Sequence, residues 1–174
     1  MAPVIVGVMA AFSSNEEDRG QWDYELLHDG AVSGFRDEEH LSLVVSHLRD
    51  LGYGIAETRG CHHTELLQHL LSQVSMHYCG WSVKNLDALR YIDFSAVTGW
   101  ALVIRDFDLT YHADQHWARE VADIVAEVSY EHLLRGNRLL ALLHCEGHEL
   151  KLGRLGGHEP WWRGTHRRAA SVGP

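Results

Sequence analysis

Acidic and aromatic side chains lie close together in the middle of the chain, in an arrangement suited to binding a cationic surface. Asn85 opens the pentapeptide Asn-Leu-Asp-Ala-Leu, whose acid is Asp87, and Asp93 follows six residues later. Carboxylates held on a rigid helix can imitate phosphate groups, and a fully desolvated charge pair can dominate an interface. Tyr78 and Trp81 precede the pentapeptide, and either could anchor a partner. These residue types predict a binding surface.

Each of these residues also has a structural interpretation, which the sequence leaves open. Asp87 lies in the first turn of a short helix predicted over about 85–94, where an acid favours the helix dipole and capping. Tyr78 and Trp81 could instead pack between elements. Arg90 and Tyr91 are typical of surface residues, although they occupy the suspected contact face.

Regular apolar patterns on both sides of this segment predict the elements that position it. A short strand is predicted at 55–59, and the continuous apolar runs at 100–104 and 139–143 are typical of buried strands. Helical periodicity covers 64–74 and 117–134. The resulting order is strand–helix–helix–strand–helix–strand. This order predicts an α/β fold with a small parallel sheet flanked by helices.

The ends of the chain follow other patterns. Residues 1–12 are apolar, as in a buried strand, and two β-prone runs at 22–28 and 31–35 flank Asp29-Gly30, a strong hairpin turn signal. A helix is predicted over 37–51. The predicted organisation is an N-terminal strand, hairpin and helix addition at 1–52, a domain at 53–146, and a flexible Gly- and Arg-rich tail at 147–174.

The charge is negative and uneven. The chain has a net charge of −9 with neutral histidines. Residues 151–174 hold five of the 15 bases and one of the 24 acids, so residues 1–150 carry 10 bases and 23 acids, a net −13. Such a body repels nucleic acid and attracts a basic partner. The acids could also serve solubility alone.

The cysteine content and the first residues predict a cytoplasmic location. Three cysteines do not build a disulfide framework, which favours a reducing compartment. The first basic residue is Arg19, so the initial apolar run lacks the cationic start of a signal peptide. The same run is far shorter than the roughly 20 residues that cross a bilayer, so no membrane association is expected.

Residues 53–145 resemble the barstar family, small acidic proteins that plug the catalytic groove of a ribonuclease. The pentapeptide and the order of the elements carry the resemblance. It implies that Asp87 reaches the phosphate-binding bases of the enzyme and that Glu127, late in the long helix, makes a second contact. It also implies an aromatic anchor over the catalytic histidine, either Trp81 or Tyr78. The implied partner is a basic secreted ribonuclease or a nuclease-like toxin.

The contact helix departs from the family pattern at two positions. The family's second principal acid is replaced by Tyr91, with Asp93 two residues further on, and its usual Trp is Arg90. A cation facing a cationic active site is repulsive unless it turns away or finds an acid on the partner. These departures predict an immunity protein directed at a different toxin. A regulatory interaction module without inhibitory action is the alternative.

Histidines and cysteines raise the question of a metal site. None of the candidates has the paired spacing of a strong zinc site, so we expect no metal. The candidates are Cys61-His62-His63, His77 with Cys79, and His144-Cys145-x-x-His148.

An enzyme is another class to consider. His144, Cys145, Asp106 and Asp108 follow two predicted strands, at the edge where α/β folds place ligands. The chain has no nucleophile elbow, phosphate loop or Gly-rich dinucleotide turn. We therefore expect no catalysis and no cofactor.

Overall fold

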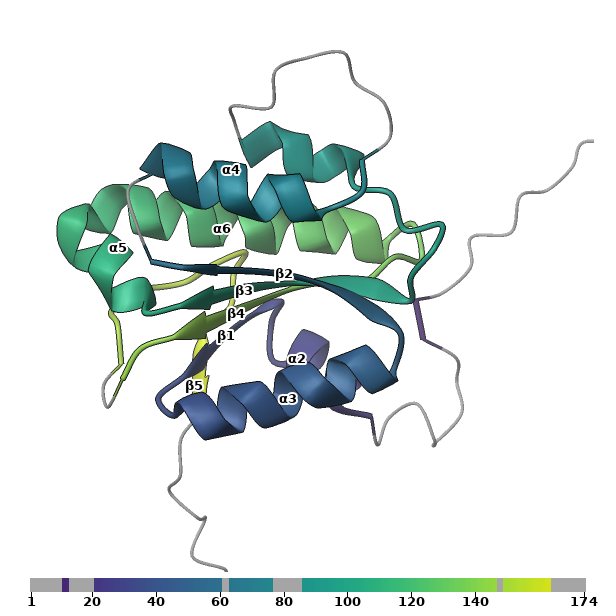
Figure 1. Cartoon of the computed structure of the whole chain (residues 1–174), viewed down its shortest axis with the longest axis horizontal. Coiled ribbons are helices and arrows are strands. Elements are labelled where there is room, and N and C mark those ends of the chain that lie inside the picture. The colour runs from purple at the N-terminus through teal and green to yellow at the C-terminus, as the bar shows by residue number, and fades with distance from the viewer. Residues whose placement is uncertain (1–10, 13–20, 61–62, 77–85, 147–148, 164–174) are drawn as a thin grey trace, which may run out of the picture.

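The computed structural model describes residues 11–12, 21–60, 63–76, 86–146 and 149–163 (Figure 1). The secondary-structure elements, in chain order, are α2 (Trp22–His28), β1 (Val32–Phe35), α3 (Glu38–Asp50), β2 (Tyr53–Arg59), α4 (His63–Gln73), the 3-10 helix η1 (Leu86–Tyr91), β3 (Gly99–Arg105), α5 (Phe107–Ala113), α6 (Gln115–Leu133), β4 (Leu139–His144) and β5 (Trp161–Arg163).

Five strands form one sheet in the order β2-β3-β4-β1-β5, and every pair of neighbours is parallel. All residues of β4 and all but the last of β3 are buried, as expected for parallel strands covered on both faces. The predicted α/β fold with a parallel sheet flanked by helices is confirmed.

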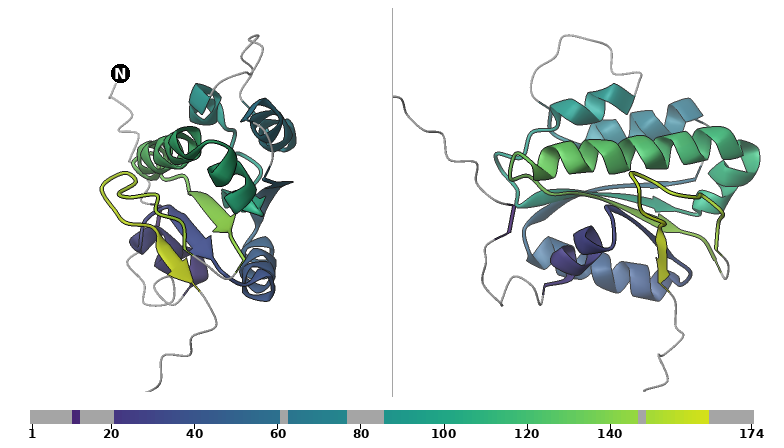
Figure 2. Two further views of the ribbon diagram at one scale, coloured as in Figure 1. Left: turned by 90° about the vertical axis from the view of Figure 1, so that its left-hand side faces the viewer. Right: turned by 180° about the vertical axis from the view of Figure 1, so that it is seen from behind.

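Helices cover both faces of the sheet. In Figure 1, α4, α5, α6 and η1 lie on one side and α2 and α3 on the other, and Figure 2 shows the same three layers from other directions. Alternate residues of β3 enter separate cores. Leu102 and Ile104 pack toward α4 and α6, whereas Ala101 and Val103 pack toward α3.

The predicted N-terminal hairpin is wrong. Residues 22–28 form the helix α2, and β1 lies between β4 and β5, parallel to both. The Asp29-Gly30 turn joins the helix α2 to the strand β1. Gly30 adopts a φ of 109° in this turn, a conformation that glycine allows in a hairpin and in a helix-to-strand connection alike. All four residues of β1 are buried, and only an inner position in the sheet gives them this cover.

The prediction of a flexible tail is wrong for residues 149–163. Leu150, Leu152 and Leu155 are buried in the core on the α6 side, and β5 pairs with β1. The ring of Trp162 lies directly over Gly34, where a Cβ atom would come within 2.2 Å of it. The segment before residue 53 and this C-terminal segment thus each add a strand to one sheet. Residues 1–10 and 164–174 are outside the described part of the chain.

Candidate functional site

The acidic segment forms a short 3-10 helix on the α6 side of the sheet. The predicted helix over 85–94 is shorter in the structure, where η1 ends at Tyr91. Ala88, Leu89 and Ile92 are buried, and this spacing turns Asp87 outward with 70% of its side chain exposed. Beyond η1, an antiparallel bridge joins Ile92 to Met76, which follows α4.

A buried histidine of α6 connects η1 to this helix by a hydrogen bond. The Nε2–H group of His132 donates to the carbonyl oxygen of Leu89 at 3.0 Å, and the His132 ring lies 4.7 Å from the ring of Phe94. Burial lowers the pKa of His132 below its ordinary value of 6.5, only partly opposed by the bond to Leu89. The neutral ring therefore links η1 to α6 at neutral pH.

Arg90 connects the acids of η1 with those of α6. Its Nη1 donates to Oε1 of Glu131, and its Nε lies 3.8 Å from Oδ1 of Asp87. The hydrogen bond to Glu131 is the main reason why the pKa of Arg90 is raised, and the charges of Asp87 and Glu127 add to it. The same bond lowers the pKa of Glu131. Four charged groups of two elements thus lie on one surface.

The other predicted contact residues differ in how far their side chains are exposed to solvent. Tyr91 is 53% exposed, and Glu127 is exposed on α6. Asp93 is half-buried, and its Oδ1 accepts the backbone N–H of Ser95 at 2.8 Å, so it shapes the turn after η1. Asn85, Tyr78 and Trp81 lie outside the described residues.

Three further residues lie on the surface around η1 and α6 and were not predicted from the sequence. Tyr130 and Glu131 follow Glu127 by three and four residues, so they share its exposed stripe of α6. Leu134, the C-cap residue seven positions after Glu127, continues this stripe. Tyr130 is 64% exposed and Leu134 59%. Helical spacing from Glu127 could have identified them, but only the fold shows that Glu131 lies beside Arg90. We call Asp87, Arg90, Tyr91, Glu127, Tyr130, Glu131 and Leu134 the η1/α6 surface.

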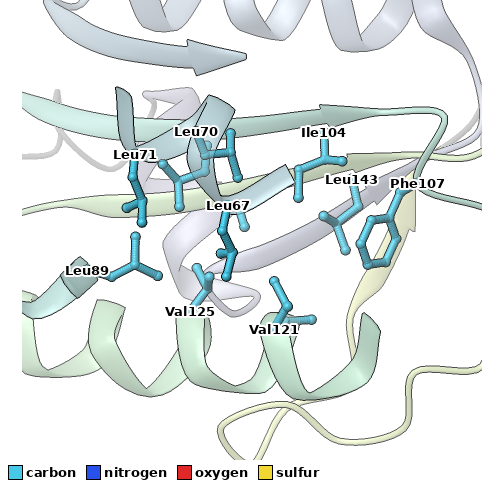
Figure 3. Close-up of a pocket in the computed structure, with 12 residues that line it drawn as sticks. Leu67, Leu70, Leu71, Leu89, Ile104, Phe107, Val121, Val125 and Leu143 are labelled. Carbon is cyan, nitrogen blue, oxygen red and sulfur yellow. The ribbon is translucent and has the colours of Figure 1, made fainter. Parts of the chain in front are cut away.

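A small cavity between η1, α4, α6 and the sheet belongs to the core. It measures about 10 Å³ and has an entirely apolar lining that includes Leu67, Leu89 and Val125 (Figure 3). This is about the smallest space that holds one water molecule, which would also need polar partners. The cavity therefore cannot take a small-molecule ligand.

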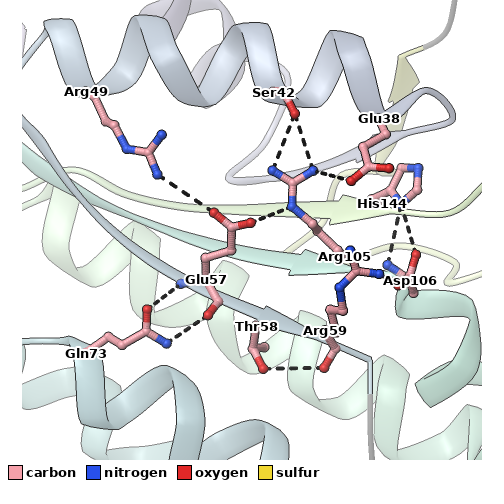
Figure 4. Close-up of polar contacts among 10 residues, drawn as sticks. All are labelled: Glu38, Ser42, Arg49, Glu57, Thr58, Arg59, Gln73, Arg105, Asp106 and His144. Atoms are coloured by element: carbon pink, nitrogen blue, oxygen red, sulfur yellow. Dashed lines mark hydrogen bonds and ion pairs between the residues drawn. The ribbon is translucent and has the colours of Figure 1, made fainter.

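A second polar cluster lies at the carboxyl ends of the strands (Figure 4). Arg59 Nη1 donates to Asp106 Oδ2 at 2.6 Å, and Nδ1 of His144 lies 3.7 Å from Asp106 Oδ1. Cys145 belongs to the core on the α6 side, and burial raises the pKa of its thiol to about 12. The thiol is therefore protonated at neutral pH, unlike an activated cysteine nucleophile.

Metal ligands do not gather in the part of the chain that the structure describes: no group of three or more His, Cys, Asp or Glu residues there could hold an ion. Cys61, His62, His77, Cys79 and His148 lie outside that part. No helix among the same described residues is long and apolar enough to cross a membrane.

Comparisons of the chain with protein-family models, with curated proteins and with solved structures found no match.

Proposed function

We propose that this protein is a barstar-like inhibitor or immunity protein, which blocks a basic ribonuclease-like toxin in the cytoplasm by covering its active site. The observation that carries the proposal is the η1/α6 surface. It combines the carboxylates of Asp87, Glu127 and Glu131 with exposed Tyr91. Acids recognise a cationic groove, and aromatic side chains supply buried area at low entropic cost.

The proposed action needs binding alone and no chemical step. Buried Ala88 and Leu89 fix η1 to the core, and the bond from His132 ties it to α6. The carboxylates are therefore presented on a supported scaffold, which reduces the ordering cost of association. The net charge of −9 adds long-range attraction for a basic partner.

Arg90 restricts which partners fit this surface. In the free protein its guanidinium already pairs with Glu131 and lies near Asp87. A uniformly cationic groove would meet a partly neutralised surface, with Arg90 as a repulsive element. The surface therefore suits a toxin that offers bases to Asp87 and Glu127 and an acid to Arg90.

The test is a titration of a small basic ribonuclease with the full chain at low and high salt. We expect stoichiometric inhibition that weakens with salt. Asp87→Ala and Glu131→Ala should each weaken inhibition at least tenfold. Each acid would be buried against a base of the toxin in the complex, and loss of one partner of such a charge pair costs about 2–5 kcal/mol. Glu120→Ala is the matched control, since it removes an exposed acid of α6 away from η1. Equal effects of all three substitutions would refute this surface.

A non-inhibitory interaction module is the second candidate. Tyr130 and Leu134 extend exposed apolar area along α6, beyond the acids next to η1. Such area is typical of a protein contact surface in general. A module of this kind would bind its partner through Tyr130 and Leu134 and leave ribonuclease activity unchanged at any ratio.

A further inference from the structure

The topology creates a crossing point between β1 and β4, apart from the η1/α6 surface. The chain leaves β1 toward α3, on one face of the sheet. It leaves β4 toward Leu150 and Leu152, which are buried on the other face. Adjacent parallel strands whose connections leave in opposite directions form a topological switch point, and open α/β sheets bind ligands just outside it.

His144 is the last residue of β4 at this point, and only 3% of it is exposed. Its Nδ1 lies 3.4 Å from the backbone N–H of Asp106, which can only donate. Nδ1 therefore accepts, and the neutral ring carries its hydrogen on Nε2. Nε2 is buried and has no hydrogen-bond partner among the described residues. A buried donor left without an acceptor is costly, which points to an acceptor that the described residues do not supply.

Two neighbouring arginines repeat this feature. The Nε atoms of Arg36 and Arg163 are also buried without a partner in the described part of the protein. Phe35 stands opposite both His144 and Arg163 in the sheet register, and Arg36 follows it. The three donors thus occupy the ends of three adjacent strands, which are spaced about 4.8 Å apart.

The nearby carboxylates each pair with an arginine, and none of them is bonded to His144 Nε2 or to the Nε atoms of Arg36 and Arg163 in the described part of the protein. Glu149 pairs with Nη2 of Arg36, and Glu38 pairs with Arg105. Asp106 pairs with Arg59 and has a φ of 51°, a backbone conformation that residues other than Gly adopt uncommonly. Such conformations cluster at functional sites, and Asp adopts them more readily than most residues.

We propose that the carboxyl edge between β4 and β1 binds a small oxyanion, a carboxylate or a phosphate group. His144 Nε2–H is its principal donor from the α3 face of this edge, and Arg36 donates from the opposite face of the sheet. An oxyanion carries several acceptor lone pairs and no obligatory donor, which matches a site whose unpaired atoms are all N–H groups. This site is separate from the proposed inhibitory surface.

The test titrates the full chain with inorganic phosphate and, separately, with acetate, at an ionic strength held constant with NaCl. Long-range ¹H–¹⁵N spectra report the His144 ring, assigned by its loss in His144→Asn. We expect a saturable shift of Nε2 with at least one anion, and the stronger of the two identifies the class. No shift with either anion at 50 mM would overturn the proposal.

Variants then locate the site by calorimetric titration. His144→Asn removes the distal donor and should weaken binding at least tenfold, whereas His144→Gln keeps an amide near the Nε2 position and should bind better than His144→Asn. Arg36→Gln should also weaken binding. Arg49→Gln is the matched control, because Arg49 is an exposed base on α3 paired with Glu57. Equal losses in the Arg36 and Arg49 variants would mean a general ionic effect and would overturn the assignment.

Discussion

At the scale of single residues, Arg90 sets the charge of the η1/α6 surface. Its bond to Glu131 joins the 3-10 helix η1 to the long helix α6. The side chains of Arg90 and Glu131 are 34% and 38% exposed, so solvent screens the pair. Exposed ion pairs contribute little to stability, about 0–1 kcal/mol. The pair therefore affects binding and titration more than folding.

We expect Arg90→Ala to raise the pKa of Glu131, because Arg90 is the main cause of its depression. A ¹³C titration of the glutamate carboxyl groups measures this change. The same variant should bind a ribonuclease with a uniformly cationic groove more tightly, since one repulsive charge is removed. Arg49→Ala, with the same charge change on α3, should leave Glu131 unaltered; an equal shift in both variants would contradict the pairing.

His132 predicts how stability depends on pH. Its folded pKa is lowered by burial, so the unfolded chain takes up a proton as the pH falls through 6.5 while the folded chain does not. Stability should therefore decrease below pH 6.5, until the folded His132 itself becomes protonated. Urea unfolding at pH 7.5 and 5.5 measures the loss. His132→Gln should reduce it, whereas His28→Gln, at an exposed position, should not.

At the scale of elements, α2 is fastened to the sheet by a buried charge. Asp23 of α2 is fully buried and accepts from Tyr53 Oη at 2.9 Å and from Arg138 Nη1 at 2.6 Å. Burial, reinforced by the charge of Asp23, raises the pKa of Tyr53 above its ordinary value of 10, so its hydroxyl remains a donor.

Asp23→Ala should cost about 3–5 kcal/mol, because it leaves Arg138 partly buried without its counter-charge. Tyr53→Phe should cost only about 1 kcal/mol, the contribution of one hydrogen bond. Denaturant unfolding measures both. Asp50→Ala, at an exposed position of α3, is the control. Similar losses for Asp23→Ala and Asp50→Ala would show that the buried network has no special role.

The edge strand β2 is protected by a side chain of α4. Gln73 Oε1 accepts from the backbone N–H of Glu57 at 3.0 Å, and Gln73 Nε2 donates to the Glu57 carbonyl oxygen at 2.8 Å (Figure 4). The amide thus takes the place of a further strand.

Gln73→Ala should expose these groups of β2 and promote association between copies of the chain. Sedimentation velocity over a range of protein concentrations detects the larger species. Gln68→Ala removes an exposed glutamine of the same helix and should remain unchanged. A monodisperse Gln73→Ala variant at high concentration would count against a protective role.

At the scale of the whole molecule, the C-terminal segment completes the fold. A chain ending at Glu146 would lose β5 and three buried leucines, Leu150, Leu152 and Leu155, each of which contributes about 1.5–3 kcal/mol on burial. We expect a marked decrease in melting temperature, measured by circular dichroism. A chain ending at Arg163 keeps every described residue and serves as the control. Equal melting temperatures for the two chains would refute this role of the segment.

The sequence by itself determined the features that depend on local patterns. Helical periodicity and continuous apolar runs predicted α3, α4, α6, β3 and β4, because each element is amphipathic or buried over its own length. The parallel sheet followed from the order of these elements. The outward position of Asp87 likewise follows from its spacing to buried Ala88 and Leu89.

Only the tertiary structure decided which distant segments meet. The pairing of β1 with β4 and β5 and the contact of Arg90 with Glu131 join groups that lie far apart in the chain. The burial of His144 Nε2 without a partner among the described residues likewise depends on the packed fold. Turn chemistry at Asp29-Gly30 is compatible with either a hairpin or a helix-to-strand connection, so it could not choose between them. The burial of β1 on both faces decides for the helix-to-strand connection. An inner strand forms backbone hydrogen bonds on both sides and buries its side chains on both faces of the sheet.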